Sequence, residues 1–215
     1  MPKVPAAFRP ALALAGAFLL LAVLEELSFL EGVDARGILA VAEWRSAALT
    51  SLMRAISWFG DGNAMAPLAF LLTGWIARAR GRRAALGYFL SALTGWALYG
   101  VLKAVFARPR PSVVPRLDGA GWWSFPSGHA MSSAIIFGLA VILLTDTTAY
   151  PRRVVWIRGV VFAFILAVAF SRVYLGVHYP SDVVAGVLAG AGWTSATRAL
   201  MDRQAPQSPP PSGRP

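Results

Sequence analysis

The chain has 215 residues, of which 57% are hydrophobic and 14% charged, and it carries 20 Lys and Arg residues against 10 Asp and Glu. Soluble domains average about 45–50% apolar and about 25% charged residues, so this composition argues against a soluble globular domain and, away from the chain ends, against disorder. A net charge of +10 is typical of nucleic-acid-binding proteins, but so few charged residues among so many apolar ones indicate an integral membrane protein instead. The absence of cysteine excludes disulfides, thiolate metal sites and cysteine nucleophiles.

Six apolar stretches approach the length of about 20 residues that crosses a bilayer. They are residues 8–24, 63–77, 84–107, 129–145, 154–171 and 181–200. The first has Lys3 and Arg9 before it, as a signal peptide would, but the Glu25-Glu26 pair that follows offers no small-residue cleavage site. We therefore expect a retained first helix and an all-α, integral membrane bundle of six transmembrane helices.

Residues 33–59 have a different pattern, in which apolar and charged side chains alternate at helical spacing. Such a segment is amphipathic rather than membrane-spanning. Trp44 and Trp58 are of the residue type that anchors helices at membrane interfaces. The segment predicts an additional amphipathic interfacial helix between the first and second transmembrane helices.

The composition changes again near the C-terminus, where residues 203–215 are polar and rich in proline. Such a segment is expected to be a disordered tail. No internal repeat divides the rest of the chain. We therefore expect residues 1–202 to form a single membrane domain with its core at 60–200.

Lys and Arg residues in short loops predict which way the bundle faces, because cytoplasmic loops of membrane proteins are enriched in them. With six crossings, the second and fourth connections between helices lie on the same side as both termini. The cations gathered there are Lys3, Arg9, Arg78, Arg80, Arg82, Arg83, Arg152, Arg153, Arg203 and Arg214. We expect this side to face the cytoplasm. The chain is then a multi-pass protein of the inner (cytoplasmic) membrane, with both termini in the cytoplasm.

A second group of cations lies at the opposite helix ends. Lys103 and Arg110 stand at the end of the third helix, and Arg172 closes the fifth. Three fixed cations suit a dianionic tetrahedral group, because Arg gives bidentate hydrogen bonds and Lys supplies a point charge. Ser127 and Gly128 open the fourth helix, where free N–H groups and the helix dipole also favour an anion. The pattern predicts a phosphate-binding site on the outer, periplasmic face.

Both histidines of the chain lie in the same segments, His129 after Gly128 and His178 shortly before the sixth helix. Histidine is the side chain suited to proton transfer or nucleophilic attack near neutral pH. Asp182 follows His178 by four residues, about one helical turn. Its carboxylate can accept a hydrogen bond from one ring nitrogen and leave the other free to attack phosphorus.

The order and spacing of these residues resemble the three-part signature of the type-2 phosphatidic acid phosphatase superfamily. The parts are Lys103-x6-Arg110-Pro111, Pro126-Ser127-Gly128-His129 and Ser171-Arg172-x5-His178-x3-Asp182. The resemblance covers residues 60–200, including the six-helix layout. One departure is an additional Arg108-Pro109 directly before Arg110-Pro111. The six-residue spacing selects Arg110, and Arg108 is an additional candidate for contact with phosphate.

The resemblance implies a metal-independent lipid phosphohydrolase that uses no cofactor. His178 would attack phosphorus in line and form a phosphohistidine, with Asp182 orienting the ring. His129 would protonate the leaving oxygen and then activate water for the second step. The phosphate oxygens would be held by Lys103, Arg110, Ser127, Gly128 and Arg172. A hard-cation site would need several Asp or Glu residues, which these motifs lack.

The implied substrate is a phosphorylated membrane lipid, with the bilayer as the other partner and no nucleic acid or protein partner. Undecaprenyl diphosphate, phosphatidylglycerophosphate, phosphatidic acid and lipid A phosphates are the candidates, and an outer-facing site fits undecaprenyl diphosphate best. One alternative is a phosphotransferase that passes the same phosphoryl group to a hydroxyl. Another is a non-catalytic lipid binder or transporter, although this chain keeps every motif residue. A halide-oxidising enzyme shares a related site in soluble proteins, and the spanning helices argue against it.

Three further features have both a functional and a structural interpretation. Trp122-Trp123 either gates the substrate or belongs to an interfacial aromatic belt. The turn at 118–121 either covers the site or is a mobile surface loop. Gly186 and Gly190 in the last helix predict close packing against a neighbour.

Overall fold

The computed structural model describes residues 5–204, so residues 205–215 of the predicted tail lie outside the described part. The described residues contain helices and no strand. A short 3₁₀ helix, η1 (Ala6–Phe8), leads into the first α-helix. The α-helices are α1 (Arg9–Glu26), α2 (Glu31–Ala42), α3 (Ala47–Trp58), α4 (Gly62–Arg80), α5 (Arg82–Phe106), α6 (Gly128–Thr145), α7 (Pro151–Tyr174) and α8 (Pro180–Arg203).

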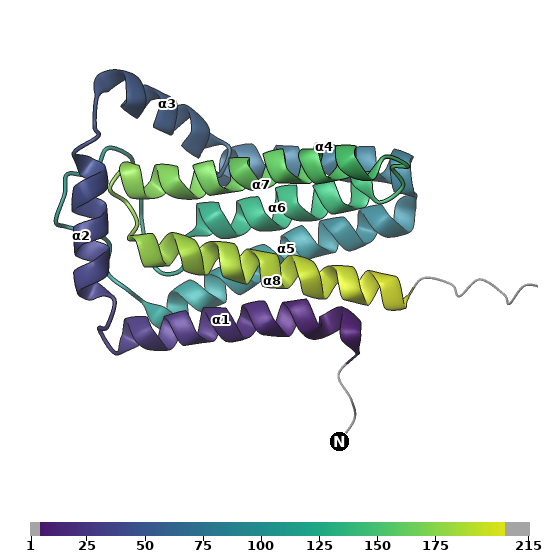
Figure 1. Ribbon diagram of the computed structural model, residues 1–215, viewed down its shortest axis with the longest axis horizontal. Helices are drawn as coiled ribbons and strands as arrows, with labels where there is room; N and C mark the ends of the chain where they lie inside the picture. The colour runs from purple at the N-terminus through teal and green to yellow at the C-terminus, as the bar shows by residue number, and fades with distance from the viewer. Residues whose placement is uncertain (1–4, 205–215) are drawn as a thin grey trace, which may run out of the picture.

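The long helices α1 and α4 to α8 run side by side, while α2 lies across one end of the bundle (Figure 1). Helix α6 contacts α4, α5, α7 and α8, and α8 contacts α1, α5, α6 and α7. These two helices therefore form the centre. Their close approach depends on glycine, because a Cβ at Gly186 would lie 2.5 Å from the Ser127 carbonyl oxygen, and one at Gly190 would lie 2.6 Å from that of Met131. The predicted close packing of these small residues is confirmed.

The surface of the bundle is apolar in the way a lipid-facing surface is. Phe70 on α4 and Trp156 on α7 are 72% and 75% exposed. Four helical segments of residues 5–204 are long and apolar enough to cross a membrane, namely Ala6–Glu26, Arg82–Phe106, Gly128–Thr145 and Pro151–Tyr174. Helices α4 and α8 are long enough to cross a membrane, but their mean hydropathy is lower. Their sequences contain Arg side chains and many small or polar residues. Six crossings therefore stay a prediction.

The predicted single helix at 33–59 is wrong in number, because the structure has two helices there, α2 and α3. Helix α2 ends at Ala42, and the backbone of Ser46 is extended at φ −142° and ψ 163°. The Ser46 hydroxyl then accepts a hydrogen bond from the Leu49 N–H and caps a new helix. Trp44 and Trp58 are 61% and 59% exposed, as interfacial anchors would be.

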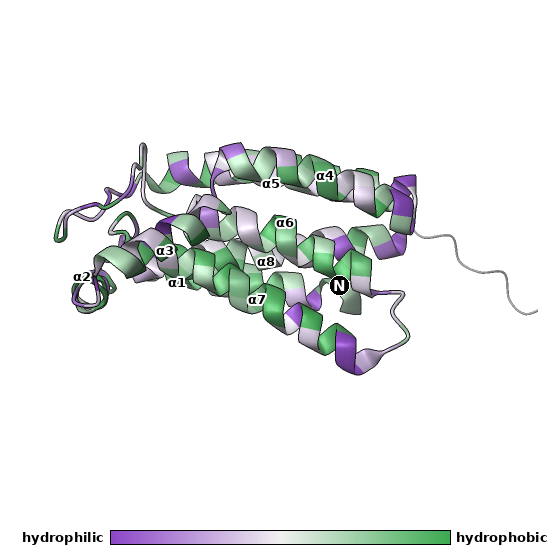
Figure 2. Cartoon of the chain, turned by 90° about the horizontal axis from the view of Figure 1, so that it is seen from above, coloured by the Kyte–Doolittle hydropathy of each residue, from purple (hydrophilic) through white to green (hydrophobic). Residues whose placement is uncertain are grey.

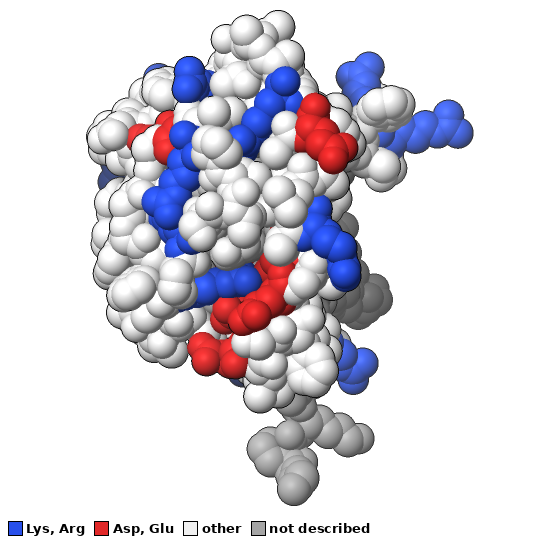
Figure 3. Space-filling view, turned by 90° about the vertical axis from the view of Figure 1, so that its left-hand side faces the viewer, with Lys and Arg blue, Asp and Glu red and all other residues white. Residues whose placement is uncertain are grey.

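The two ends of the bundle differ in their charged residues. The α4–α5 turn and the α6–α7 loop both lie at one end of the bundle, where the hydropathy colouring shows polar residues (Figures 1 and 2). This end holds the arginines at 78–83 and 152–153. Helix α2, the loop 107–127 and the α7–α8 turn lie at the other end. Acidic and basic side chains mix on that face (Figure 3).

Candidate active site

The first part of the site comes from the end of α5 and the start of α6. Helix α5 ends where Ala107 takes a left-handed conformation with φ 42°, which leaves Lys103 in the last helical turn, fully buried. Helix α6 begins at Gly128, behind an extended Ser127 whose N–H donates to the Asp182 carbonyl oxygen at 2.9 Å. Gly128 is required there, because a Cβ would lie 2.6 Å from the Tyr99 ring.

The second part is the turn between α7 and α8. The N–H groups of Val177 and His178 both donate to the Arg172 carbonyl oxygen, so the chain folds back over the end of α7. Gly176 permits this with a positive φ of 76°. Helix α8 then starts at Pro180, and the Asp182 carboxylate accepts from the Tyr179 N–H at 2.8 Å. The cap of α8 thus fixes the carboxylate beside the turn that carries His178.

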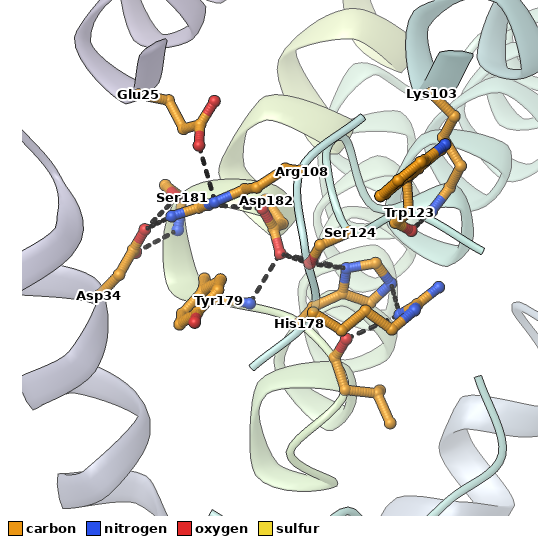
Figure 4. A network of polar contacts seen from close by, with 12 residues as sticks. Glu25, Asp34, Lys103, Arg108, Trp123, Ser124, His178, Tyr179, Ser181 and Asp182 are labelled. Atoms are coloured by element: carbon orange, nitrogen blue, oxygen red, sulfur yellow. Dashed lines mark hydrogen bonds and ion pairs between the residues drawn. The ribbon is translucent and has the colours of Figure 1, made fainter. Parts of the chain in front are cut away.

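The contacts of His178 determine its tautomer (Figure 4). Its Nδ1 lies 3.3 Å from Asp182 Oδ2, and its Nε2 lies 3.2 Å from NH1 of Arg110. An ionised carboxylate only accepts hydrogen bonds and a guanidinium only donates them. Both partners therefore require the proton on Nδ1 and a free lone pair on Nε2. That is the form in which an imidazole attacks an electrophile.

The environment of His178 also favours its neutral form. The side chain is 2% exposed. Burial lowers the pKa of His178 from 6.5 to about 4, and the nearby charges of Arg110 and Lys103 act in the same direction, while Asp182 opposes them. A nucleophilic imidazole needs its lone pair, so His178 is in its reactive form throughout the neutral and weakly acidic range.

This pKa gives a prediction for the pH dependence of activity. Protonation of His178 should remove activity only as the pH falls through about 4, because the folded pKa lies below the ordinary value of 6.5. The measurement is kcat/KM for phosphate release between pH 3.5 and 8, with protein integrity monitored at each pH. An acidic limb centred near pH 6.5 that moves when Asp182 is replaced by Asn would contradict the prediction.

All three predicted phosphate-binding cations are engaged by the loop 107–127 or its neighbours. Lys103 Nζ donates to the Trp123 carbonyl oxygen, and Arg110 donates to the carbonyl oxygens of Gly121, Trp122 and Val177 at 2.7–3.0 Å. Arg172 NH1 lies 2.6 Å from Asp118 Oδ2. The segment 118–123 therefore lies over the cations, and a phosphate that bound to them would have to displace its oxygens. This favours the covering interpretation of the turn and the gating interpretation of the tryptophans.

Replacing Asp118 by Asn should strengthen substrate binding. The Asp118 carboxylate is paired with Arg172, which is predicted to bind phosphate, and it is partly exposed at 36%. A partly exposed ion pair is worth up to about 1 kcal/mol, so we expect KM to fall about threefold with little change in kcat. Steady-state kinetics and the inhibition constant of inorganic phosphate measure this effect. An increase in KM would instead mean that Asp118 orients Arg172 for phosphate.

Two buried donors near these cations lack a partner among residues 5–204. They are the Ser127 hydroxyl and Nε of Arg172, on side chains that are 0% and 3% exposed. A buried donor without an acceptor costs free energy, so such groups indicate a ligand or water in the native protein. Ser127 also precedes the first turn of α6, whose free N–H groups favour an anion. The donor set fits the oxygens of a phosphoryl group.

A cavity of about 540 Å³ reaches His129 from between α4, α5 and α6. Its lining includes Trp96, Tyr99 and Trp122, so its walls are largely aromatic. The backbone of Gly60 packs on the His129 ring, since a Cβ there would lie 2.7 Å from its Cδ2. His129 thus faces a space that can hold a leaving group, and Trp122, which also lines this space, is 61% exposed.

Several polar residues around the site are not part of the sequence signature. Ser124 donates to the Asp182 carboxylate, and Ser57 accepts from Arg172. Arg108 does not join the cations that face phosphate, because its guanidinium contacts carboxylates of α1, α2 and α8. Glu25 of α1 is one of these ion-pair partners. Nothing in the local sequence pattern singles out Ser57 or Ser124.

No group of three or more His, Asp or Glu side chains that could hold a metal ion occurs among residues 5–204. The acidic residues nearest the site are instead paired with Arg108, Arg172 and His178. Metal independence stays a prediction.

Comparison with known proteins agrees with this geometry. Residues 84–206 match the family model of the PAP2 superfamily. Decaprenylphosphoryl-5-phosphoribose phosphatase of Mycobacterium tuberculosis is 34% identical over 162 residues, which cover 74% of this chain and 78% of that protein. The undecaprenyl-diphosphatase of Sulfolobus acidocaldarius is 33% identical over 69% of this chain and 68% of its own length. The crystal structure of a transmembrane PAP2-type phosphatidylglycerolphosphate phosphatase from Bacillus subtilis superposes with a TM-score of 0.84 at 25% identity, covering 90% of this chain and 96% of that one.

Proposed function

The chain belongs to the PAP2 superfamily and is a lipid phosphohydrolase, and we propose that it works through a phosphohistidine formed on His178. One observation carries the proposal: the Nε2 lone pair of His178 points at Arg110, while Asp182 holds the opposite nitrogen. The nucleophile therefore lies beside a group that binds phosphoryl oxygens.

In the first step, Nε2 of His178 attacks phosphorus and the bond between phosphorus and the lipid oxygen breaks. Arg110 moves from Nε2 to a phosphoryl oxygen, where Lys103, Arg172, the Ser127 hydroxyl and the Gly128 N–H complete the cradle. His129, which faces the cavity, gives its proton to the departing lipid oxygen. The proton on Nδ1 stays with His178, and the Asp182 carboxylate stabilises the charge that develops on the ring.

In the second step, the P–N bond is broken by water. His129 has lost its proton in the first step and is now able to accept one from the water molecule. The oxygen of that water attacks phosphorus, inorganic phosphate leaves, and the electron pair of the P–N bond returns to Nε2. His129 is protonated again, so the site is restored without a net change in protons on the enzyme.

The substrate we propose is a polyprenyl-linked phosphate or diphosphate. The names of two relatives specify such lipids, a decaprenylphosphoryl-5-phosphoribose phosphatase and an undecaprenyl-diphosphatase. The aromatic cavity beside His129 lies between helices whose outer faces are apolar, so a hydrocarbon tail can remain in the bilayer while its phosphate reaches the cations.

We further propose six crossings, by α1 and α4 to α8, with α2 and α3 at the outer interface and the arginine-rich end in the cytoplasm of an inner-membrane protein. Residues 1–202 then form one domain with its core at 60–200. Because the chain has no cysteine, single-cysteine variants test the orientation cleanly. In intact cells, an impermeant maleimide should label Arg116→Cys and should not label Arg152→Cys. The reverse pattern would overturn the orientation.

The test of function is release of inorganic phosphate by the purified protein in the presence of a chelator. The panel holds undecaprenyl diphosphate, decaprenylphosphoryl-5-phosphoribose, phosphatidylglycerophosphate and phosphatidic acid, with no lipid acceptor added. We expect release that the chelator does not reduce and that is fastest from a polyprenyl substrate. A need for an acceptor hydroxyl would contradict hydrolysis, and loss of activity with the chelator would contradict metal independence.

A further inference from the structure

Arg108 forms the centre of a buried ionic cluster behind the candidate nucleophile (Figure 4). Its Nε lies 2.8 Å from Glu25 Oε1, its NH2 2.8 Å from Asp34 Oδ2, and its NH1 2.7 Å from Asp182 Oδ1. The guanidinium carbon also stacks 4.3 Å from the centre of the Tyr179 ring. Arg108 is 7% exposed, Asp34 1% and Asp182 0%. One cation thus joins three carboxylates from α1, α2 and α8.

We propose that Arg108, held by Asp34 and Glu25, is a positioning residue that sets the orientation of Asp182 and, through it, of His178. This inference rests on the proposed function of His178. It assigns a role to the first Arg-Pro pair of the loop, which the six-residue spacing of the signature leaves out. It also couples the α1–α2 corner, which lies outside residues 84–206, to the catalytic residues.

The two carboxylate oxygens of Asp182 have different hydrogen-bond partners. Oδ1 accepts from Arg108 NH1, while Oδ2 accepts from His178 Nδ1, the Tyr179 N–H and the Ser124 hydroxyl. A carboxylate that accepts hydrogen bonds at both oxygens is confined to one rotamer, so its Oδ2 faces the imidazole at a fixed angle. Without Arg108, Oδ1 would be buried without a charge partner, and the carboxylate would rotate or take up water.

Arg108 is itself held from the opposite side. Asp34 accepts from the Ser181 N–H at 2.9 Å as well as from the Ser181 hydroxyl. It therefore ties α2 to the first turn of α8, one residue before Asp182. Arg108 NH1 also donates to the Ser181 hydroxyl at 2.8 Å. The cluster thus fixes the start of α8 relative to α1 and α2, and a shift of α2 would be transmitted to Asp182.

The geometry separates this role from phosphate binding. Every guanidinium nitrogen of Arg108 contacts a carboxylate, whereas Arg110 and Arg172 bond mainly to loop oxygens that phosphate can displace. Three carboxylates around one cation leave an excess of negative charge, which repels a phosphate dianion. A positioning residue should affect the rate of the chemical step and leave substrate affinity almost unchanged.

The experiment compares Arg108→Gln and Arg108→Lys with a matched control, Arg116→Gln. Arg116 is an exposed arginine of the same loop, and its Nε donates to the Pro111 carbonyl oxygen. We expect Arg108→Gln to lower kcat about 10- to 100-fold, the range seen when a group that orients a site ligand is removed. KM should stay within about twofold, Arg108→Lys should recover part of the loss, and Arg116→Gln should resemble the unmodified protein.

A double-mutant cycle tests whether Arg108 acts through Asp182. In an Asp182→Asn background, Arg108→Gln should lower kcat by less than about threefold, because the carboxylate that Arg108 positions is absent. Equal losses in both backgrounds, or a rise in KM without a loss of kcat, would overturn the proposal. If Arg108→Gln fails to fold, the effects of Asp34→Asn and Arg108→Lys on kcat are compared in the same two backgrounds. An inactive unmodified protein would instead contradict the proposed function and not this inference.

Discussion

Replacing His178 by Gln should lower kcat for lipid phosphate release by at least about 10⁴-fold, the scale on which loss of a nucleophile acts. In the proposed mechanism this side chain supplies the attacking lone pair, and Nε2 is the ring nitrogen that faces Arg110 at 3.2 Å. The change leaves Lys103, Arg110 and Arg172, the cations proposed to bind phosphate, in place. The dissociation constant of inorganic phosphate, measured from its protection of the protein against thermal unfolding, should therefore change by only a few-fold.

The comparison of rate with binding is the control for this variant. Loss of both catalysis and phosphate protection would indicate a collapsed site and would leave the nucleophile unidentified. Retention of more than about 1% of the turnover, with correct folding, contradicts nucleophilic attack by His178.

Replacing His129 by Gln should produce the second largest effect, a loss of about 10²–10⁴-fold on a lipid phosphate, as expected for a general acid–base residue. The size of the loss should depend on the leaving group. The aryloxide released from an aryl phosphate can depart without a proton, so the first step with this substrate should be nearly normal. The second step still needs His129 to activate water, so the phosphoenzyme should accumulate during turnover.

The measurement is a comparison of burst amplitudes for an aryl phosphate in the unmodified protein and in His129→Gln. A burst of aryl alcohol near one equivalent per site, followed by slow turnover, is the expected result for the variant. Equal losses on lipid and aryl substrates, with no burst, would show that His129 does not act on the leaving group.

The sequence predicts most of the helices and the contact between His178 and Asp182, for identifiable reasons. Long apolar runs delimit α5, α6 and α7 closely, because in a membrane the hydrophobic length of a helix is set by the bilayer. His129, His178 and Asp182 are identifiable because a catalytic imidazole and its carboxylate partner need fixed residue types at fixed spacing. The structure places His178 and Asp182 in contact, as that spacing predicts.

The contacts made across the fold could not be predicted from local pattern. Arg108 looks like a second phosphate ligand in sequence, yet its partners Glu25 and Asp34 come from a corner more than 70 residues away. The break between α2 and α3 depends on one cap at Ser46. The hydrogen bonds from Lys103 and Arg110 to the loop 107–127 depend on backbone carbonyl oxygens, which are the same in every residue type and leave no trace in the sequence.

The most direct test of the account is detection of the intermediate. His129→Gln is mixed with an aryl phosphate, quenched in alkali, where phosphohistidine survives, and digested for mass spectrometry. The account predicts one added phosphoryl group on the peptide that contains His178, and none when His178 is also replaced by Gln. A phosphoryl group on another residue, or steady turnover with no phosphorylated peptide at any quench time, would contradict it.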